Sequence, residues 1–499
     1  MASDSQPAFL LSIIQLDETA ETPLYQQLYS GLQQGILSHQ LRPGLRLPST
    51  RDLSGLFGVS RNTVLNAVEQ LMAEGYLEAR PRSGTYVSRQ LPETFLETPA
   101  VLGQSDGRFT NRDNLSERGQ RLGYTPSTVA RPFFRHHAFS HGVPAVDVFP
   151  FATWARLVNK HYRQASRLLF DDSGRIVAGY EPLREAIAEY LQVARAVRCG
   201  PEQVIVVSGS QQALYLVAHL LLDPGDKVWV EEPGYVGARG AFRAAGAELV
   251  PVPVGKDGLD AATGIALAPE AACAYVTPSH QFPLGKTMSV ATRLKLLNWA
   301  AESGAWIIED DYDNEYRYSG QPIPAMQGLD QRERVIYIGT FSKVLFPGLR
   351  LGYLVVPPAL VEPFVTARRL MDVQSPVIPQ AALADFIEQG HFARHLRRMR
   401  TLYGERLKLL VETADKHLNG RLQIETAEAG MHTVGWLPEG VDDEAAFAAA
   451  ARHEVEVTPL SQYYLGRCPR PGLVMGFAAT PENEVLPGIL RLRKALETI

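Results

Sequence analysis

The first 90 residues carry apolar side chains at helical spacing. Residues 22–37 form one apolar stripe, made of Leu24, Leu28, Leu32 and Leu37. Proline and glycine between 43 and 48 end this helix. Ser49 is then expected to cap a second, short helix, with Asp52 completing a capping box and Gly58 ending it in the left-handed conformation.

A third helix is predicted from the cap at Ser60 to about Glu74. The apolar residues on its buried face are Val64, Val68 and Leu71. The polar residues that point elsewhere are Arg61, Asn62 and Asn66. Gly75 stops the helix, and two short strands at 76–79 and 85–87 follow, joined by a turn. Helix, short helix, tight turn, helix and hairpin is the plan of a winged helix-turn-helix.

The pattern changes twice after residue 88. Residues 89–130 are rich in small, polar and charged residues without a sustained period, which predicts a linker. From 131 onward, apolar runs of strand length alternate with helical stretches rich in alanine and leucine. The runs lie at 204–207, 228–230, 274–276, 306–308, 335–338 and 353–356. This alternation indicates an α/β domain with a mostly parallel sheet and helices on both faces.

The bulk composition is that of a globular protein with more than one domain. The chain has 499 residues, of which 45% are hydrophobic and 21% charged. Its three cysteines, Cys199, Cys273 and Cys468, lie far apart, so neither a zinc site nor a disulfide framework is expected, and a reducing cytoplasm fits. We expect no metal and no membrane span, because no uncharged apolar run approaches the required length.

The charge of the N-terminal region differs from that of the whole chain. The formal net charge is −5, but residues 24–88 hold six arginines against four acidic residues. Arg61, Asn62 and Thr63 occupy the first turn of the third helix, the end that enters the major groove in helix-turn-helix proteins. Arg51 and the helix N-termini suit phosphates. The predicted wing tip consists of Arg82, Ser83 and Gly84. A small helical module that binds protein is the alternative.

Three segments of the α/β region suggest a ligand site. The turn Ser208-Gly-Ser-Gln-Gln after the first strand could hold a phosphate on the helix N-terminus, although many such turns look alike. Glu231-Glu-Pro-Gly-Tyr235 ends in an aromatic residue that could stack on a flat ring or simply join the core. Four carboxylates in 309–313 follow a buried strand, where α/β sheets place ligand chemistry; a solvated loop or a metal site is the alternative.

A lysine completes this set of motifs. Lys343 follows a predicted strand, Thr340 and Ser342 precede it, and Arg350 lies seven residues later. A single lysine in a loop is usually only solvated. In this combination it suits a Schiff base beside a phosphate group.

These motifs resemble known families over most of the chain. Residues 43–87 resemble the GntR-type winged helix. The segments SGSQQAL, EEPGY, TPSHQFPLG, IIEDDYDNEY and GTFSKVLFPGLRLGY resemble fold type I aminotransferases that depend on pyridoxal 5'-phosphate, in the order found in MocR-family regulators. The resemblance implies a mostly parallel seven-stranded sheet and a smaller C-terminal α+β part. The expected boundaries are 20–88 for the winged helix, 89–130 for the linker and 131–499 for the rest, divided near 375/376.

The resemblance also implies roles for individual residues. Lys343 would carry the cofactor as a Schiff base, Asp310 would pair with the pyridine nitrogen, Tyr312 would bind the ring oxygen and Tyr235 would stack on the ring. The phosphate would be held by Ser210, Gln211, Thr340, Ser342 and Arg350. The residues implied at operator DNA are Arg51, Ser60, Arg61, Asn62, Thr63, Ser83 and Gly84. Two positions depart from the pattern: Leu65 replaces an arginine of some relatives, and Phe282 replaces an asparagine.

One further departure bears on turnover. Leu473 or Val474 stands where aminotransferases carry the arginine that binds the substrate carboxylate, with Arg467 and Arg470 as possible substitutes. We therefore expect a regulator rather than an enzyme, one that senses the cofactor itself or an amine or amino acid and binds double-stranded operator DNA. By resemblance it would be a homodimer, head-to-tail and domain-swapped. An active aminotransferase with an accessory DNA-binding domain and a scaffold without cofactor are the alternatives.

Overall fold

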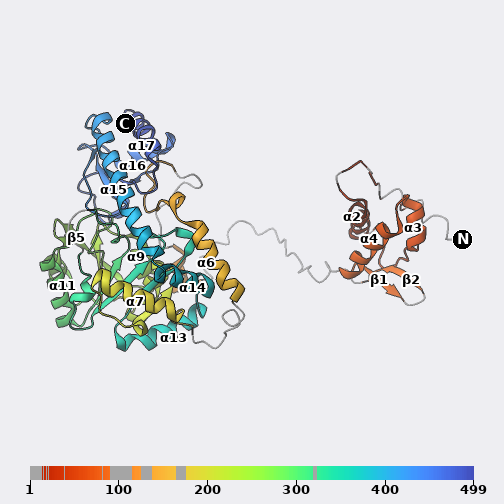
Figure 1. Cartoon of the computed structure of the whole chain (residues 1–499), viewed down its shortest axis with the longest axis horizontal. Coiled ribbons are helices and arrows are strands. Elements are labelled where there is room, and N and C mark those ends of the chain that lie inside the picture. Colours follow the sequence, from red (N-terminus) through yellow and green to blue (C-terminus); the bar gives the residue numbers. More distant parts are fainter. Residues whose placement is uncertain are drawn as a thin grey trace. The chain divides into compact units, whose positions relative to one another are not determined.

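The computed structural model divides the chain into two compact units, Met1–Thr110 and Asn111–Ile499, which are described separately (Figure 1). The described residues are 10, 14, 16–17, 19–20, 22–38, 40–80, 83–89, 115–124, 137–164, 176–318 and 323–499. Within them, no helix combines the length and the apolar composition that crossing a membrane requires.

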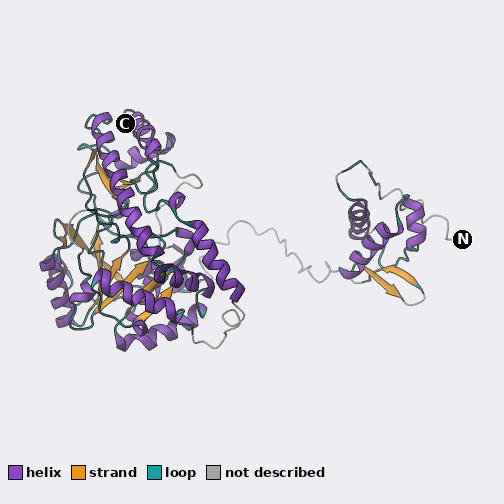
Figure 2. Cartoon of the chain, in the orientation of Figure 1, coloured by secondary structure: helices purple, strands orange, loops and turns teal. Residues whose placement is uncertain are grey.

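The described part of the first unit contains the helices α2, α3 and α4 and a two-stranded antiparallel hairpin (Figure 2). Its elements are α2 Leu24–Leu37, α3 Thr50–Phe57, α4 Arg61–Ala73, β1 Leu77–Arg80 and β2 Gly84–Val87. Helix α4 packs against α2, α3 and β1. The core between these elements includes Leu28, Leu32, Leu53, Val64 and Leu71. The predicted winged helix-turn-helix is confirmed.

The local signals predicted for this unit are present in the structure. The Ser49 hydroxyl accepts a hydrogen bond from the Asp52 amide at 3.2 Å, and the Asp52 carboxylate accepts one from the Ser49 amide, so the capping box is confirmed. Gly58 has φ +66°, the left-handed conformation predicted for it. One prediction was wrong: Leu37 is exposed, and Ile36 occupies the buried position at the end of α2.

The second unit is built on an eight-stranded sheet in the order β3-β10-β9-β8-β7-β4-β5-β6. The strands are β3 Val204–Val207, β4 Lys227–Glu232, β5 Glu248–Gly255, β6 Gly258–Leu259, β7 Cys273–Val276, β8 Trp306–Asp311, β9 Val335–Thr340 and β10 Gly352–Val355. Four neighbouring pairs are parallel, whereas β10 runs antiparallel to β3 and β9 and β6 antiparallel to β5. The α/β class and the mostly parallel sheet are confirmed.

The expected number of seven strands is corrected by β6, a two-residue strand added at the edge. The apolar-run pattern also missed β5, because Pro251 and Pro253 interrupt its sequence. Proline has no amide hydrogen and is tolerated at a sheet edge. Residues Glu248 to Pro253 pair on one side only, with β4, and this leaves both prolines in an edge segment.

Helices cover both faces of this sheet, which explains why its strands read as continuous apolar runs. Along β3, Val204 and Val206 face the cluster that contains α7 and α14, while Ile205 and Val207 face the cluster formed by α8, α9 and α13. The bounds of the helices are α6 Phe151–Gln164, α7 Glu181–Arg195, α8 Ser210–Leu221, α9 Val236–Ala245, α10 Ala261–Leu267, α11 Val290–Ser303, α12 Met326–Leu329, α13 Val361–Asp372 and α14 Val377–Glu388.

The C-terminal part adds a second, smaller sheet, drawn in blue in Figure 1. Its four strands are antiparallel in the order β11-β12-β14-β13, with bounds Gln423–Ile424, His432–Trp436, Gly472–Gly476 and Thr458–Pro459. The helices beside it are α15 His391–His417, α16 Asp443–Arg452 and α17 Glu482–Leu496. This is the expected α+β part, and the long α15 connects it to α14.

The segment predicted to be a linker contains a helix, α5 Glu117–Tyr124, which packs against α9. The second unit therefore begins near residue 111 by its contacts, earlier than the expected boundary at 131. The remaining residues of that segment, 90–114 and 125–130, lie outside the described residues. Short helices rich in charge show little apolar periodicity, which is why the sequence pattern did not identify α5.

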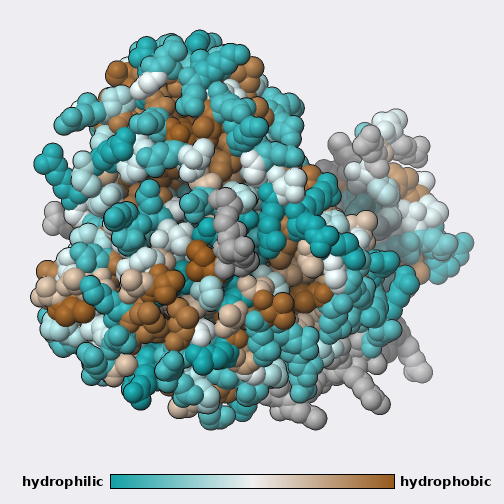
Figure 3. Space-filling view, turned by 60° about the vertical axis from the view of Figure 1, so that its left-hand side comes forward, coloured by the Kyte–Doolittle hydropathy of each residue, from teal (hydrophilic) through white to brown (hydrophobic). Residues whose placement is uncertain are grey.

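The surface shown in Figure 3 is mostly hydrophilic, with hydrophobic side chains in separate patches. Among the described residues of the second unit, several large apolar side chains are strongly exposed. They include Val193, Leu370, Met371 and Val373. Three of these lie at the end of α13, and Asp372 there accepts a hydrogen bond from Gln212 of α8 at 2.9 Å.

Candidate functional site

A cavity of about 220 Å³ opens at the carboxyl ends of the parallel strands in the second unit. All nine residues predicted to bind a cofactor line it: Ser210, Gln211, Tyr235, Asp310, Tyr312, Thr340, Ser342, Lys343 and Arg350. They come from the carboxyl ends of β8 and β9 and from the segments that follow β3, β4, β8 and β9. Strands of the same sense bring their carboxyl ends to one edge, which is where α/β sheets bind ligands.

Lys343 and Asp310 lie in the walls of this cavity. Lys343 Nζ donates a hydrogen bond to the backbone oxygen of Gly142 at 2.7 Å. Asp310 Oδ2 accepts one from the Tyr275 hydroxyl at 2.8 Å. Its second oxygen, Oδ1, is buried and has no hydrogen-bond partner among the described residues. A buried acceptor without a partner fits a ligand that brings an N–H group.

The same burial changes the acidity of Asp310. Its pKa is raised to about 7, mainly by loss of solvent and further by the nearby carboxylates Asp311 and Asp313, against the Tyr275 hydrogen bond and Lys343, which lower it. A cationic N–H group at Oδ1 would favour the ionised form. The carboxyl is therefore suited to pair with a protonated ring nitrogen.

The opposite end of the cavity suits an anion. Gly209 has φ +103°, and a β-carbon there would lie 3.5 Å from the Arg350 guanidinium, so backbone and cation lie close together. Helix α8 begins at Ser210 without a side-chain cap, which leaves amide groups at a positive helix end. The Ser342 amide donates to Thr340 Oγ1 at 3.2 Å, and Ser342 Oγ is buried without a partner among the described residues.

Two aromatic residues form further walls. Tyr235 precedes α9, and its ring lies against Gly237, where a β-carbon would come within 2.5 Å of the ring. Its ring centroid is 6.0 Å from that of Phe282 in an edge-to-face arrangement. Tyr312 is half-buried, and its hydroxyl lies 3.0 Å from His280 Nδ1. Burial raises the pKa of Tyr312 well above its usual value, so the hydroxyl keeps its hydrogen.

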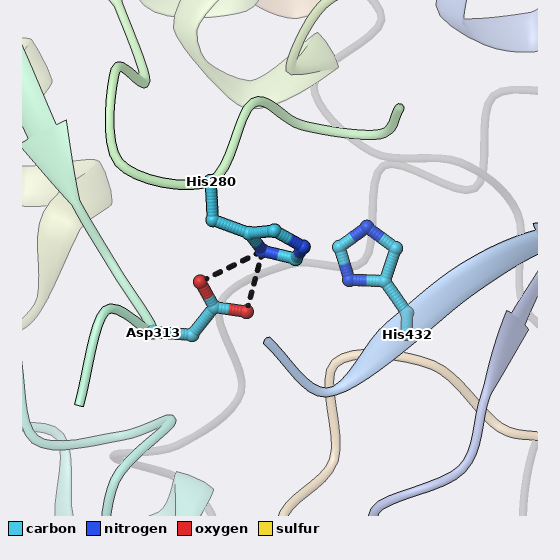
Figure 4. A group of neighbouring side chains, drawn as sticks. All are labelled: His280, Asp313 and His432. Carbon is cyan, nitrogen blue, oxygen red and sulfur yellow. Dashed lines mark hydrogen bonds and ion pairs between the residues drawn. The ribbon is translucent and has the colours of Figure 1, made fainter. Parts of the chain in front are cut away.

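A buried group behind Tyr312 consists of His280, Asp313 and His432 (Figure 4). His280 Nδ1 lies 3.0 and 3.1 Å from the two Asp313 oxygens, and the His280 and His432 ring centroids are 5.0 Å apart. His432 Nε2 donates to the Pro283 oxygen at 3.2 Å, and burial lowers the pKa of His432 well below its usual value. Ligand atoms of this group lie close enough to hold a metal, so the expectation of no metal stays a prediction.

Sequence reasoning missed several residues of the cavity wall. They are His141, Gly142, Tyr275, Thr277, Pro347, Met431 and His432. His141 precedes the first large helix of the unit, and Met431 and His432 belong to the small sheet, so folding brings them to the site from distant parts of the chain. No spacing in the sequence marks them.

The structure also locates the residues around the missing arginine. Leu473 and Val474 lie in β14 and are fully buried. Arg470 stacks on Trp436, with its guanidinium carbon 4.5 Å from the ring centroid, and lines another cavity. Arg467 is exposed. Among the described residues that line the cofactor cavity, Arg350 is the only arginine.

The first unit presents the predicted DNA-binding residues on its surface. Arg51, Ser60, Arg61 and Asn62 are exposed at the starts of α3 and α4, and Thr63 is half-buried. The Ser60 hydroxyl accepts from the Thr63 amide at 3.1 Å and caps α4. Gly84 starts β2 with φ +117°, next to the half-buried Ser83. Arg82 of the predicted wing tip lies outside the described residues.

Comparisons with known proteins agree with both units. The family model for aminotransferase class I and II matches residues 174–487, and that for bacterial regulatory proteins of the gntR family matches residues 24–87. A probable rhizopine catabolism regulatory protein, MocR, from Rhizobium meliloti is 43% identical over 96% of this chain and 95% of its own. The pyridoxine biosynthesis transcriptional regulator PdxR from Corynebacterium glutamicum is 31% identical over 93% and 92%.

A solved structure extends the likeness to the cofactor. The α-aminoadipate aminotransferase LysN from Thermus thermophilus, in complex with N-(5'-phosphopyridoxyl)-L-leucine, superposes with a TM-score of 0.69 at 27% identity. The match covers 78% of this chain and 98% of that one. The buried acceptor of Asp310 and the anion-binding end of the cavity fit pyridoxal 5'-phosphate. The chain therefore belongs to the aminotransferase class I and II family and, with its GntR-family domain, to the MocR-type regulators, which bind DNA and depend on pyridoxal 5'-phosphate.

Proposed function

We propose that this regulator senses an amine through a cofactor held on Lys343 and transmits its binding to operator DNA. The observation that carries the proposal is that Lys343, Asp310 and Arg350 line one cavity, with an unpartnered carboxylate oxygen at one end and a cation beside a helix N-terminus at the other. Bound to a lysine, pyridoxal 5'-phosphate supplies an electrophilic carbon that amines attack.

The residues of the chain then have distinct roles in this proposal. Asp310 Oδ1 accepts the ring N–H and keeps that nitrogen protonated. The amides at the start of α8, together with Thr340, Ser342 and Arg350, bind the phosphate. Tyr235 covers one ring face, and the Tyr312 hydroxyl donates to the ring oxygen. Lys343 provides the amine that an incoming effector amine displaces.

The effector class follows from the other walls of the cavity. Among its described lining residues the only arginine is Arg350, which lies at the phosphate end. The remaining walls include His141, Phe282, Met431 and His432. We infer an effector recognised mainly through its amino group, since an α-carboxylate would lack the bidentate arginine that orients amino acids. The cofactor itself is the simpler effector and is tested alongside amines.

The DNA-binding surface and the assembly are the second half of the proposal. Arg61, Asn62 and Thr63 would meet base edges, and Arg51, Ser60, Ser83 and Gly84 would lie at the backbone. The exposed Leu370, Met371 and Val373 near α8 favour a homodimer that covers this corner. A head-to-tail, domain-swapped arrangement in the cytoplasm is the expected form.

The test combines absorbance with footprinting of the full-length protein. Purified wild type is expected to be yellow with the cofactor, and Lys343→Ala is expected to lose the visible band. Footprints on the DNA upstream of the gene should change when a primary amine is added to the wild type and stay constant for Lys343→Ala. A colourless protein that gains no band from added cofactor contradicts the proposal.

An active aminotransferase is the second candidate, favoured by the complete set of cofactor residues. It predicts conversion of an amino donor to a keto acid over many turnovers. The regulator predicts spectral change without accumulating product. Incubation with amino acids and direct assay of the keto acid separates the two candidates.

A further inference from the structure

His280 and Asp313 lie behind the Tyr312 hydroxyl, and neither has a role in the cofactor site as proposed so far. His280 Nδ1 is within 3.0 Å of the Tyr312 hydroxyl and within 3.1 Å of both Asp313 oxygens. The His280 and Asp313 side chains are each 1% exposed, and Tyr312 is half-buried. Only one hydrogen can sit on Nδ1, so these contacts restrict where the other hydrogens point.

The tautomer of His280 follows from the chemistry of its partner. An ionised carboxylate has acceptors only, so the short contacts to Asp313 require a hydrogen on Nδ1. Nδ1 then has no lone pair for the Tyr312 hydroxyl, and the contact between them uses the hydroxyl oxygen as an acceptor. The hydroxyl hydrogen must point elsewhere. Tyr312 lines the cavity, which is the direction that remains for it.

His432 does not compete for Nδ1. In Figure 4 it lies on the Nε2 side of the His280 ring, whereas Asp313 lies on the Nδ1 side. His432 gives its own Nε2 hydrogen to the Pro283 oxygen. His280 Nε2, which carries the lone pair in this tautomer, is buried with no hydrogen-bond partner among the described residues. Gly430 allows this packing, because a β-carbon there would overlap the imidazole.

We propose that His280, fixed by Asp313, is a positioning residue that directs the Tyr312 hydroxyl hydrogen into the cavity and thereby lowers the pH at which the bound cofactor loses its proton. The inference rests on the proposed cofactor site. A hydrogen bond donated to the ring oxygen stabilises the form with more negative charge on that oxygen, which is the deprotonated form. Without that bond the proton is retained to higher pH.

The test is a pH titration of the visible absorption band of the cofactor-loaded, full-length protein. Tyr312→Phe removes the donor and is expected to raise the midpoint by about one to two pH units, the worth of a hydrogen bond to a charged group. His280→Leu should raise it by a comparable amount. The double variant should shift no further than Tyr312→Phe alone, because both changes remove the same interaction.

Two variants separate positioning from simple disturbance of the core. In His280→Asn the amide nitrogen takes the place of Nδ1, so it still donates to Asp313, and the midpoint should stay near that of wild type. In His280→Gln the amide lies near the place of Nε2, so the midpoint should rise even if His280→Leu does not fold. His161→Leu is the control for loss of a histidine–aspartate contact, since it removes a less buried pair, His161 with Asp385 at 2.9 Å, outside the cavity.

The other charged groups around Tyr312 stay the same in all His280 variants. They are Glu231, Asp310, Asp311, Lys343 and His432. Bound cofactor and melting temperature are measured in each sample. A wild type without a visible band would overturn the proposed function itself. A band whose midpoint moves in Tyr312→Phe but not in His280→Leu or His280→Gln, or shifts that add in the double variant, would overturn this inference alone. So would a chelator-induced shift in wild type, which would identify a metal between the two histidines.

Discussion

Gly209 meets two constraints at the start of α8. Its φ of +103° with ψ 173° is a conformation that side chains rarely adopt, and a β-carbon would lie 3.5 Å from the Arg350 guanidinium. We predict that Gly209→Ala costs about 1–3 kcal/mol of unfolding free energy. It should also weaken cofactor binding, because relief of the strained backbone at Gly209 shifts the start of α8, whose amides line the cavity. Denaturant unfolding and titration with pyridoxal 5'-phosphate measure the two effects.

Gly225 provides the control for Gly209. It also has a positive φ, +96°, but no atom lies within 4 Å of where its β-carbon would be. Gly225→Ala should therefore cost backbone strain without changing cofactor affinity. Equal affinity losses in the two variants would mean that the effect is general destabilisation.

The raised pKa of Asp310 makes the stability of the cofactor-free protein depend on pH. Burial raises its pKa in the folded state to about 7, above its ordinary value in an unfolded chain. The stability that such a group contributes is fully present below its unfolded pKa and is lost as pH rises from that value through the folded pKa, because the unfolded chain releases the proton first. The melting temperature of the cofactor-free protein should therefore fall between about pH 4 and 7 and level off above that range.

Asp310→Asn should reduce this fall, since an amide does not ionise. Part of the fall should remain, because burial also raises the pKa of three other carboxyls to about 7. These are Glu231, Glu309 and Glu315. The cofactor should flatten the curve in wild type but less in Asp310→Asn, because its ring N–H pairs only with a carboxylate. A wild-type melting temperature that rises over this range contradicts the assignment.

At the scale of single residues, the sequence predicted which side chains would meet but not how they are oriented. The nine cofactor residues follow strands of one sense, so their convergence follows from topology. His280 lies in a segment that the sequence marked, yet its bond to Asp313 depends on a turn 33 residues away. His432 reaches the cavity from a separate sheet, and no local pattern predicts that contact.

Helix α4 is the element on which DNA affinity is predicted to depend. Arg61 is exposed in its first turn, and Leu65, one turn later, is 37% exposed. Arg61→Ala should weaken binding to the DNA upstream of the gene and reduce the salt dependence of log K by about one. Leu65→Arg adds a cation on the same helix and should strengthen binding. Affinity measured over a salt series tests both changes.

Arg452→Ala is the control for charge alone. Arg452 is exposed at the end of α16 in the second unit, so its loss removes one cation that does not belong to the winged-helix unit. DNA affinity should stay unchanged. Melting temperature should stay unchanged for Arg61→Ala, since its side chain is exposed. If Arg61→Ala and Arg452→Ala weaken binding equally, α4 is not the DNA-binding element.

The elements themselves were predicted best where a local signal determines them. The cap at Ser49 and the left-handed Gly58 involve only neighbouring residues, and both were located correctly. The sequence did not predict strand β5, because its prolines are tolerated only at a sheet edge. Whether a strand lies at the edge is a property of the folded sheet. The last buried residue of α2 was predicted one position too late. Leu37 and Ile36 are both apolar, and packing in the folded unit buries Ile36.

For the whole molecule, the sequence predicted two units and a connection but placed the connection too broadly. The helix α5 packs on α9, which begins directly after Tyr235 of the cavity wall. That contact lies between segments more than 100 residues apart, so composition alone could not reveal it.

The last prediction concerns the coupling between amine binding and operator DNA binding. If an amine changes operator affinity by some factor, operator DNA must change amine affinity by the same factor, because both measure one coupling free energy. Typical couplings correspond to factors of about 5–150. Amine affinity is read from the visible band with and without operator, and operator affinity from footprints with and without amine. Lys343→Ala should show neither effect. Unequal factors would mean that the amine acts on DNA binding by a route that does not pass through the cofactor cavity.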